Sequence, residues 1–154
     1  MKASAILLAA ALTGSLQAGT YYVFSCGVMP GLARGDDETF VRAMQGINTA
    51  IVNPAFLVTF LGAPLLAVGA AVATPGPART WAVAGAVLAV GTVLVTGAGN
   101  VPLNDALDAV GQVTGAAAAD ARAAFESSWV RLNLVRSVTS AASVGCLVWA
   151  ALRS

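Results

Sequence analysis

The sequence predicts an all-α fold, a four-helix transmembrane bundle with up-and-down threading, and its length predicts a single membrane domain over residues 1–154. Two observations carry this prediction. Charged residues make up only 10% of the chain and the mean hydropathy is +0.80, whereas soluble domains carry roughly 25% charged residues. Four apolar runs also reach the ~20 residues needed to cross a hydrocarbon core. We expect spans at approximately residues 3–29, 54–73, 81–101 and 132–152.

The first apolar run has some features of a signal peptide. Lys2 precedes an apolar stretch, and Leu16-Gln17-Ala18 resembles a cleavage site. Against that interpretation, Leu16 is large for the −3 position and the apolar run continues well beyond it. We therefore expect this segment to be the first membrane span.

The connections between the spans differ in kind. Residues 74–79 are a tight turn rich in Pro and Gly. Residues 34–52 begin with acidic side chains and continue with apolar ones at helical spacing, which predicts an amphipathic interfacial helix between the first two spans. Asn53-Pro54 then supplies an N-cap and a first-turn proline for the second span. Residues 105–128 predict a partly helical extramembrane connection.

Up-and-down threading places both termini and the short turn on one side of the membrane. All 7 acidic residues lie on the opposite side. The side of the termini carries Lys2, Arg79 and Arg153 without acids, although the other side has more arginines. We expect an integral protein of a bacterial-type plasma membrane with cytoplasmic termini.

The residues that are absent restrict the chemistry. With 0 histidines, bis-His haem and His-rich copper or di-iron sites are excluded. Cys26 and Cys146 lie at different predicted depths, so we expect packing residues rather than a disulfide. The net charge of +1 and the lack of a Lys/Arg cluster argue against a nucleic-acid partner.

Threading also gathers polar residues at one end of the bundle. The ends of spans one and three meet the starts of spans two and four there, which collects every asparagine and the only charge inside an apolar run. Trp129, Asn133 and Arg136 follow i, i+4, i+7 spacing and so share a helical face. The expected polar end comprises Met29, Asn48, Asn53, Asn100, Asn104, Trp129, Asn133 and Arg136.

Structural interpretations of these residues stay open. Arg136 can extend its charge to the interface, and Trp129 can belong to an aromatic belt. Asn53 reads as an N-cap, and Asn48 as a residue on the wet face of the interfacial helix. Asn100 and Asn104 flank Pro102, where a helix is expected to end.

Several segments resemble the anthrone oxygenase-like family of small four-helix membrane proteins, largely a domain of unknown function. They are Val28-Met29-Pro30-Gly31-Leu32, Met44-Gln45-Gly46-Ile47-Asn48, Asn53-Pro54-Ala55-Phe56, Asn100-Val101-Pro102-Leu103-Asn104 and Trp129-x-x-x-Asn133-x-x-Arg136. The resemblance implies cofactor-independent oxygenation of a lipophilic, anthrone-like polyketide by dioxygen, a monooxygenase reaction.

In that reaction, Arg136 would stabilise the anionic oxygen of the substrate, and Asn100, Asn104 or Asn133 would donate hydrogen bonds. Substrate binding would fall to Trp129 by stacking, with Met29, Asn48 and Asn53 around it. Asp105 or Asp108 would have to serve as the general base, since no histidine is present.

A non-catalytic alternative remains. The same polar end would suit a membrane module that binds a lipid, a quinone or a partner membrane protein. We expect contacts with membrane lipids and a lipophilic small molecule, and we leave a homo-oligomer open.

Overall fold

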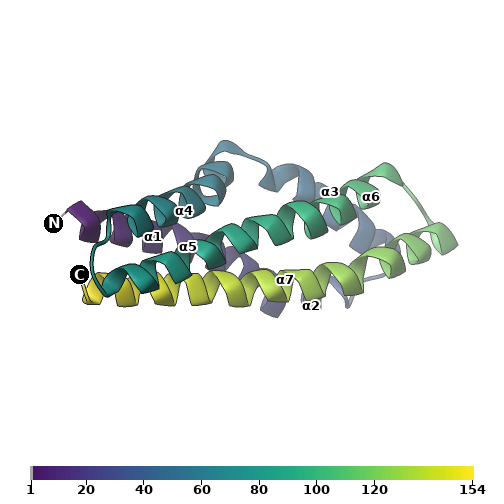
Figure 1. Ribbon diagram of the computed structural model, residues 1–154. Coiled ribbons are helices and arrows are strands. Elements are labelled where there is room, and N and C mark those ends of the chain that lie inside the picture. Colours follow the sequence, from purple (N-terminus) through teal and green to yellow (C-terminus); the bar gives the residue numbers. More distant parts are fainter. Residues whose placement is uncertain (1) are drawn as a thin grey trace.

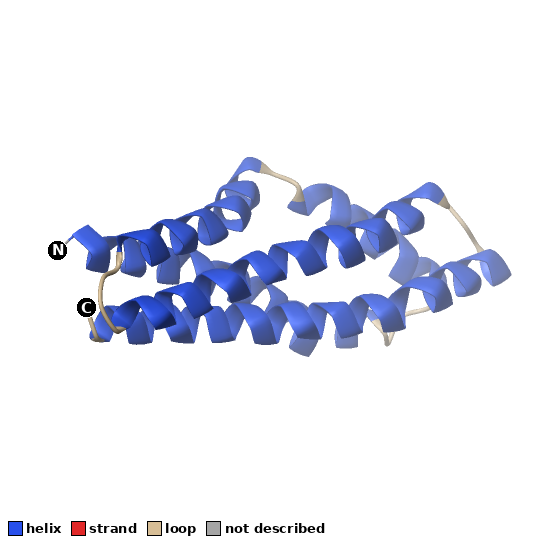
Figure 2. Cartoon of the chain, viewed as in Figure 1, coloured by secondary structure: helices blue, strands red, loops and turns tan. Residues whose placement is uncertain are grey.

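The computed structural model describes residues 2–154, and within them every regular element is a helix (Figures 1 and 2). The elements are α1 (Lys2–Val23), η1 (Phe24–Val28), α2 (Met29–Leu32), α3 (Asp37–Ile51), α4 (Pro54–Ala73), α5 (Ala78–Val95), η2 (Thr96–Asn100), α6 (Val101–Ala109) and α7 (Gly115–Leu152), where η marks a π-helical turn.

Four helical segments are long and apolar enough to cross a membrane, which confirms the expected bundle. They are Ala3–Leu32, Pro54–Ala73, Ala78–Ala109 and Gly115–Leu152. The four apolar helices indicate an integral membrane protein. The two termini and the α4–α5 turn lie at the same end of the bundle (Figure 1).

Spans three and four extend further than the apolar runs suggest. The helix α7 has 38 residues, about 57 Å at ~1.5 Å per residue, well beyond a hydrocarbon core of about 30 Å. The connection expected over residues 105–128 is therefore mostly a continuation of the spanning helices. Only residues 110–114 separate α6 from α7.

Two proline motifs are accommodated inside the helices rather than ending them. Pro30 and Pro102 each follow a π-helical turn, η1 and η2, and each occupies the first turn of the next helix. A proline cannot donate to the preceding turn and its ring crowds a carbonyl there, and a wider π turn relieves this locally. The expectation that span three ends at Pro102 is thus wrong.

Small residues form the core near the termini. Leu7, Ala67, Ala70, Ala82 and Leu147 are among its buried members. A close approach occurs at Gly85, where an added Cβ would lie 2.8 Å from the Leu147 side chain. Ser143 Oγ donates a 2.7 Å hydrogen bond to the carbonyl of Gly85. Small residues allow such close contact, and helix association in lipid relies on it.

The helix expected over residues 34–52 is present as α3, and protein covers its apolar face. Phe40 and Met44 are fully buried in a cluster with Leu107 of α6 and Phe125 of α7. Asp36 caps the helix by accepting a 2.8 Å hydrogen bond from the backbone N–H of Thr39. That bond lowers the pKa of the Asp36 carboxyl.

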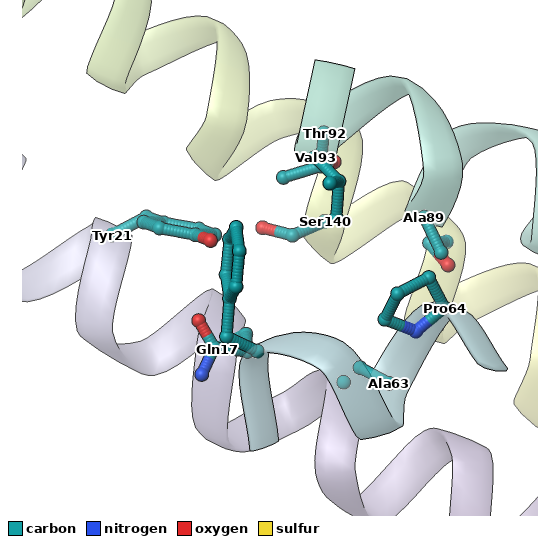
Figure 3. Close-up of a pocket in the computed structure, with 11 residues that line it drawn as sticks. Gln17, Tyr21, Ala63, Pro64, Ala89, Thr92, Val93 and Ser140 are labelled. Atoms are coloured by element: carbon teal, nitrogen blue, oxygen red, sulfur yellow. The ribbon is translucent and has the colours of Figure 1, made fainter. Parts of the chain in front are cut away.

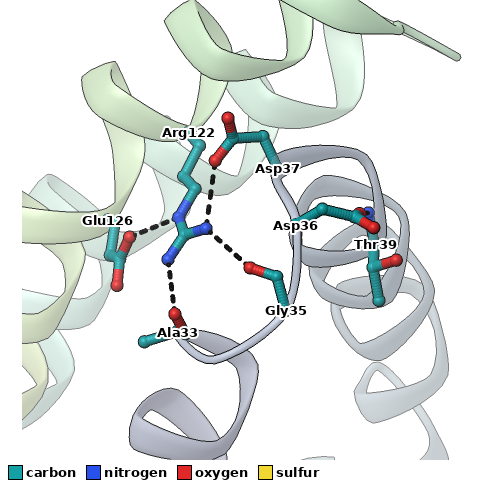
Figure 4. Close-up of polar contacts among 7 residues, drawn as sticks. All are labelled: Ala33, Gly35, Asp36, Asp37, Thr39, Arg122 and Glu126. Atoms are coloured by element: carbon teal, nitrogen blue, oxygen red, sulfur yellow. Dashed lines mark hydrogen bonds and ion pairs between the residues drawn. The ribbon is translucent and has the colours of Figure 1, made fainter.

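Arg122 of α7 fastens the α2–α3 loop to the bundle (Figure 4). Its guanidinium donates to the carbonyls of Ala33 and Gly35, both at 3.1 Å. It also pairs with Asp37 at 3.0 Å and with Glu126 at 2.7 Å. Because α3 follows this loop directly, Arg122 helps to fix where α3 begins.

Candidate functional site

A cavity of about 190 Å³ lies where α1, η1, α3, α4, η2, α6 and α7 meet. Its aromatic walls come from Tyr21, Phe24, Phe56, Phe60 and Trp129. Polar groups enter it from Thr20, Asn48, Thr96, Asn104 and Arg136. An apolar cavity with a few convergent polar groups is the usual form of a small-molecule site.

Arg136 is the only charged side chain among the residues that line this cavity. It is 7% exposed, and its guanidinium carbon lies 4.6 Å from the ring centre of Tyr21 and 5.2 Å from that of Trp129. Its Nε has no hydrogen-bond partner among the described residues. A buried cation without a carboxylate partner is costly, so this group favours an anionic ligand.

Asn133 supports Arg136 from one helical turn earlier. Its Oδ1 accepts a 2.8 Å hydrogen bond from Arg136 Nη2. Its Nδ2 donates to the carbonyl of Tyr21 at 2.9 Å and to Ser25 Oγ at 2.7 Å. Asn133 therefore ties α7 to the first span and orients the guanidinium, while it does not itself line the cavity.

Trp129 and Asn104 form one unit of the wall. Trp129 Nε1 donates a 2.8 Å hydrogen bond to Asn104 Oδ1, which fixes the indole plane. Asn100 is buried behind them and donates a long 3.4 Å bond to the carbonyl of Trp129. Of these three predicted residues, the structure brings Trp129 and Asn104 to the cavity and leaves Asn100 outside it.

Asn48 contributes a second free donor. It lines the cavity from α3, and its Nδ2 is buried without a hydrogen-bond partner within residues 2–154. The prediction placed Asn48 among the binding residues, with the wet face of the helix as the alternative. In the structure Asn48 faces the cavity rather than the outer surface of α3.

Two other predicted binding residues lie outside the cavity. Asn53 caps α4, and its Oδ1 accepts a 3.1 Å hydrogen bond from Phe56 N. Met29 is 3% exposed and packs in the cluster around Phe40. Asp105 and Asp108, the bases considered from sequence, are exposed on α6 and do not line the cavity.

The described part of the chain contains no group of three or more Cys, Asp or Glu side chains that could hold a metal ion. In a comparison with known protein families, the family model described as "Anthrone oxygenase" matches residues 40–146. The chain belongs to the anthrone oxygenase family. No curated protein and no solved structure matches the chain.

The match to the anthrone oxygenase family covers the cavity residues of α3, α4, η2, α6 and α7. It leaves out residues 1–39, and with them Met29 and the motif Val28-Met29-Pro30-Gly31-Leu32. The family model therefore does not cover the first span. That Thr20, Tyr21 and Phe24 of this span line the cavity is known from the structure alone.

Sequence reasoning missed Tyr21, Thr96 and Phe60 in this anthrone oxygenase family member. Tyr21 lies in an unbroken apolar run and matches no motif. A signal was present, since Gln17, Tyr21 and Phe24 follow i, i+4, i+7 spacing and so share a helical face. The pairing of Tyr21 with Arg136 comes from two helices far apart in sequence, and no local pattern indicates it.

Proposed function

We propose that this anthrone oxygenase family protein catalyses the cofactor-independent oxygenation of a lipophilic, anthrone-like substrate by dioxygen. The observation that carries the proposal is Arg136, a buried cation without a carboxylate in the cavity that it lines. An anthrone becomes an enolate with its charge on oxygen, so a preorganised guanidinium lowers the barrier to that anion.

The reaction balances without a further oxidant. A methylene carbon of the substrate loses two hydrogens and gains one oxygen atom of O₂ as a carbonyl. The other oxygen atom leaves with those hydrogens as water, and the substrate supplies all the electrons.

Three polar side chains of the cavity, Arg136, Asn48 and Asn104, have a role in this reaction. Arg136 pairs with the enolate oxygen, and the free N–H groups of Arg136 Nε and Asn48 Nδ2 donate to that oxygen or to a peroxide. Trp129, held by Asn104, stacks on the flat rings.

The size of the cavity supports a partly enclosed aromatic ligand. A cavity of roughly 150 Å³ accommodates one benzene ring, and this one measures about 190 Å³. A three-ring substrate would therefore reach out through a mouth lined by Val52, Leu57 and Val101, which are all exposed and apolar. Such a mouth suits a substrate that partitions into lipid.

The test is aerobic incubation of the purified protein with emodin anthrone over about pH 6–9, with quinone formation followed by absorbance. We expect turnover above the spontaneous rate, and none without oxygen. Arg136→Gln should lose most of it. Arg131→Gln is the matched control, because Arg131 lies on the same helix, is exposed and does not line the cavity. No quinone above the spontaneous rate would overturn the proposal for this substrate class.

A second candidate is a non-catalytic module that binds a lipid or a quinone. The lack of a carboxylate among the residues that line the cavity favours it, because most enzymes of this kind of chemistry need a base. Quenching of Trp129 fluorescence by a quinone, without turnover of the anthrone, would support this function. Trp129→Phe should remove the quenching.

A further inference from the structure

We propose that Tyr21 is the general base of this site, accepting the proton that the substrate carbon loses. This inference rests on the proposed oxygenase function. It assigns a catalytic role to a residue of the first span, outside the residues that the family model matches.

Among the residues that line the cavity, only Tyr21 and Arg136 carry a titratable side chain. Arg136 is a cation that donates hydrogen bonds and does not take up a proton. The carboxyls of Asp105 and Asp108 are exposed on α6, outside the cavity. Tyr21, as its phenolate, is therefore the one side chain lining the cavity that can accept a proton.

Arg136 lies over the ring face of Tyr21. Its guanidinium carbon lies 4.6 Å from the ring centre of Tyr21, which is 3% exposed. A phenolate spreads negative charge into its ring, so a cation above the ring face stabilises this form more than the neutral phenol. The other cavity residues near it, such as Phe60 of α4 and Thr96 of η2, are uncharged. Arg136 is thus the one charge in the cavity that acts on Tyr21.

A smaller cavity lies behind Tyr21. Tyr21 and Phe60 line both this space, of about 30 Å³, and the larger one. Figure 3 shows the hydroxyl oxygens of Tyr21 and Ser140 turned toward each other at this space, with Gln17 beside them. Gln17 is 5% exposed, and its Oε1 has no hydrogen-bond partner in the described part of the chain.

That space is large enough for a water, which needs roughly 10–15 Å³ and two or more polar partners. A water there would have Gln17 Oε1 and the Tyr21 oxygen among its possible acceptors. Arg136 would then stabilise the phenolate from the face of its ring, and the water would stabilise it at its oxygen, while Tyr21 also lines the larger cavity where the substrate binds.

The proton balance explains why an enclosed base suffices. Tyr21 takes the first proton from the substrate carbon, and the electron pair enters the enolate. Dioxygen accepts these electrons and bonds to the carbon, and the resulting peroxide takes the proton back from Tyr21. Tyr21 then removes the second proton while the O–O bond breaks to give the carbonyl and hydroxide. The hydroxide takes that proton and leaves as water, so no net proton has to reach the solvent.

The experiment compares Tyr21→Phe with Tyr22→Phe, since Tyr22 is the neighbouring tyrosine and is 65% exposed. General-base catalysis typically contributes 10²–10⁴-fold, so we expect Tyr21→Phe to lose roughly 100-fold or more in turnover. Its quinone affinity, from Trp129 fluorescence quenching, should stay within a few-fold of wild type. Tyr22→Phe should match wild type in both. Turnover within a few-fold of wild type for Tyr21→Phe would overturn the inference.

A second measurement separates a base from a merely structural residue. In the Tyr22→Phe background Tyr21 is the only tyrosine, because the chain has 2. Replacing it with difluorotyrosine, a more acidic phenol, should move the rising limb of the pH–rate profile to lower pH. An unmoved profile would overturn the assignment of Tyr21 and leave the oxygenase proposal standing. An inactive wild-type protein would overturn both.

Discussion

Asn133 and Arg136 lie one turn apart on α7, and a 2.8 Å hydrogen bond from Arg136 Nη2 to Asn133 Oδ1 orients the guanidinium. The other end of the Asn133 amide is bonded to the first span, through the carbonyl of Tyr21 and Ser25 Oγ. The buried amide of Asn133 thus connects Arg136 to the backbone of Tyr21, whose ring faces the guanidinium.

Asn133→Ala should therefore affect both stability and function. It removes the hydrogen bonds of Asn133 to the Tyr21 carbonyl and to Arg136 Nη2, and the loss of a partner costs a buried polar group about 1–3 kcal/mol. Thermal unfolding in detergent should show the lower stability, and quinone formation should fall because the guanidinium is no longer held. Wild-type turnover in Asn133→Ala would show that Arg136 needs no such support.

Asn48→Ala and Asn53→Ala should separate the cavity from the helix cap. Asn48 Nδ2 is a free donor in the cavity, so Asn48→Ala should weaken ligand binding by roughly fivefold, the value of about 1 kcal/mol for one hydrogen bond, with little loss of stability. Asn53 caps α4, so Asn53→Ala should cost about 1 kcal/mol of stability and leave affinity unchanged. The reverse pattern would place the site at Asn53.

Arg122→Ala should loosen the start of α3. The side chain is 17% exposed and makes charged contacts with Asp37 and Glu126, so its loss should cost about 2 kcal/mol. Hydrogen exchange should rise over residues 33–40. Arg42→Ala is the matched control, because Arg42 is 75% exposed and reaches Glu38 only at 4.0 Å. Equal hydrogen exchange in the two variants would show that Arg122 does not fix the start of α3.

Cysteine labelling should report the threading. With Cys26 and Cys146 replaced by alanine, Arg79→Cys lies in the first turn of α5 and Asp120→Cys in the extension of α7. The α4–α5 turn and the start of α7 lie at opposite ends of the bundle (Figure 1), so a membrane-impermeant maleimide should label the two cysteines from opposite sides of the membrane. Labelling of both from the same side would contradict four spans.

The site could be predicted from sequence only in part. Asn48, Asn104, Trp129 and Arg136 reach one cavity, because their positions at the ends of neighbouring spans already place them at similar depth. Asn53 and Met29 are expected at the same depth, but Asn53 caps α4 and Met29 packs in the cluster around Phe40. Depth follows from chain length, whereas the direction of a side chain depends on helix rotation, which the sequence pattern leaves undefined.

The two π turns show the same limit. Proline at 30 and 102 is visible in the sequence, and the expected consequence at Pro102 was the end of a helix. The helices instead continue, and Phe24 and Thr96, which begin the two π turns, line the cavity. Packing against α7 stabilises the continued helix, and that gain is not encoded in the local pattern.

The sequence by itself determined the membrane bundle, its four spans and the polar end, because apolar length and the scarcity of charge leave the chain no other stable arrangement. Only the tertiary structure decided which polar residues share a cavity and that Tyr21 faces Arg136. Those contacts join residues 115 positions apart in the chain. They depend on how four helices rotate and pack against one another, since no short-range spacing relates the first span to the last.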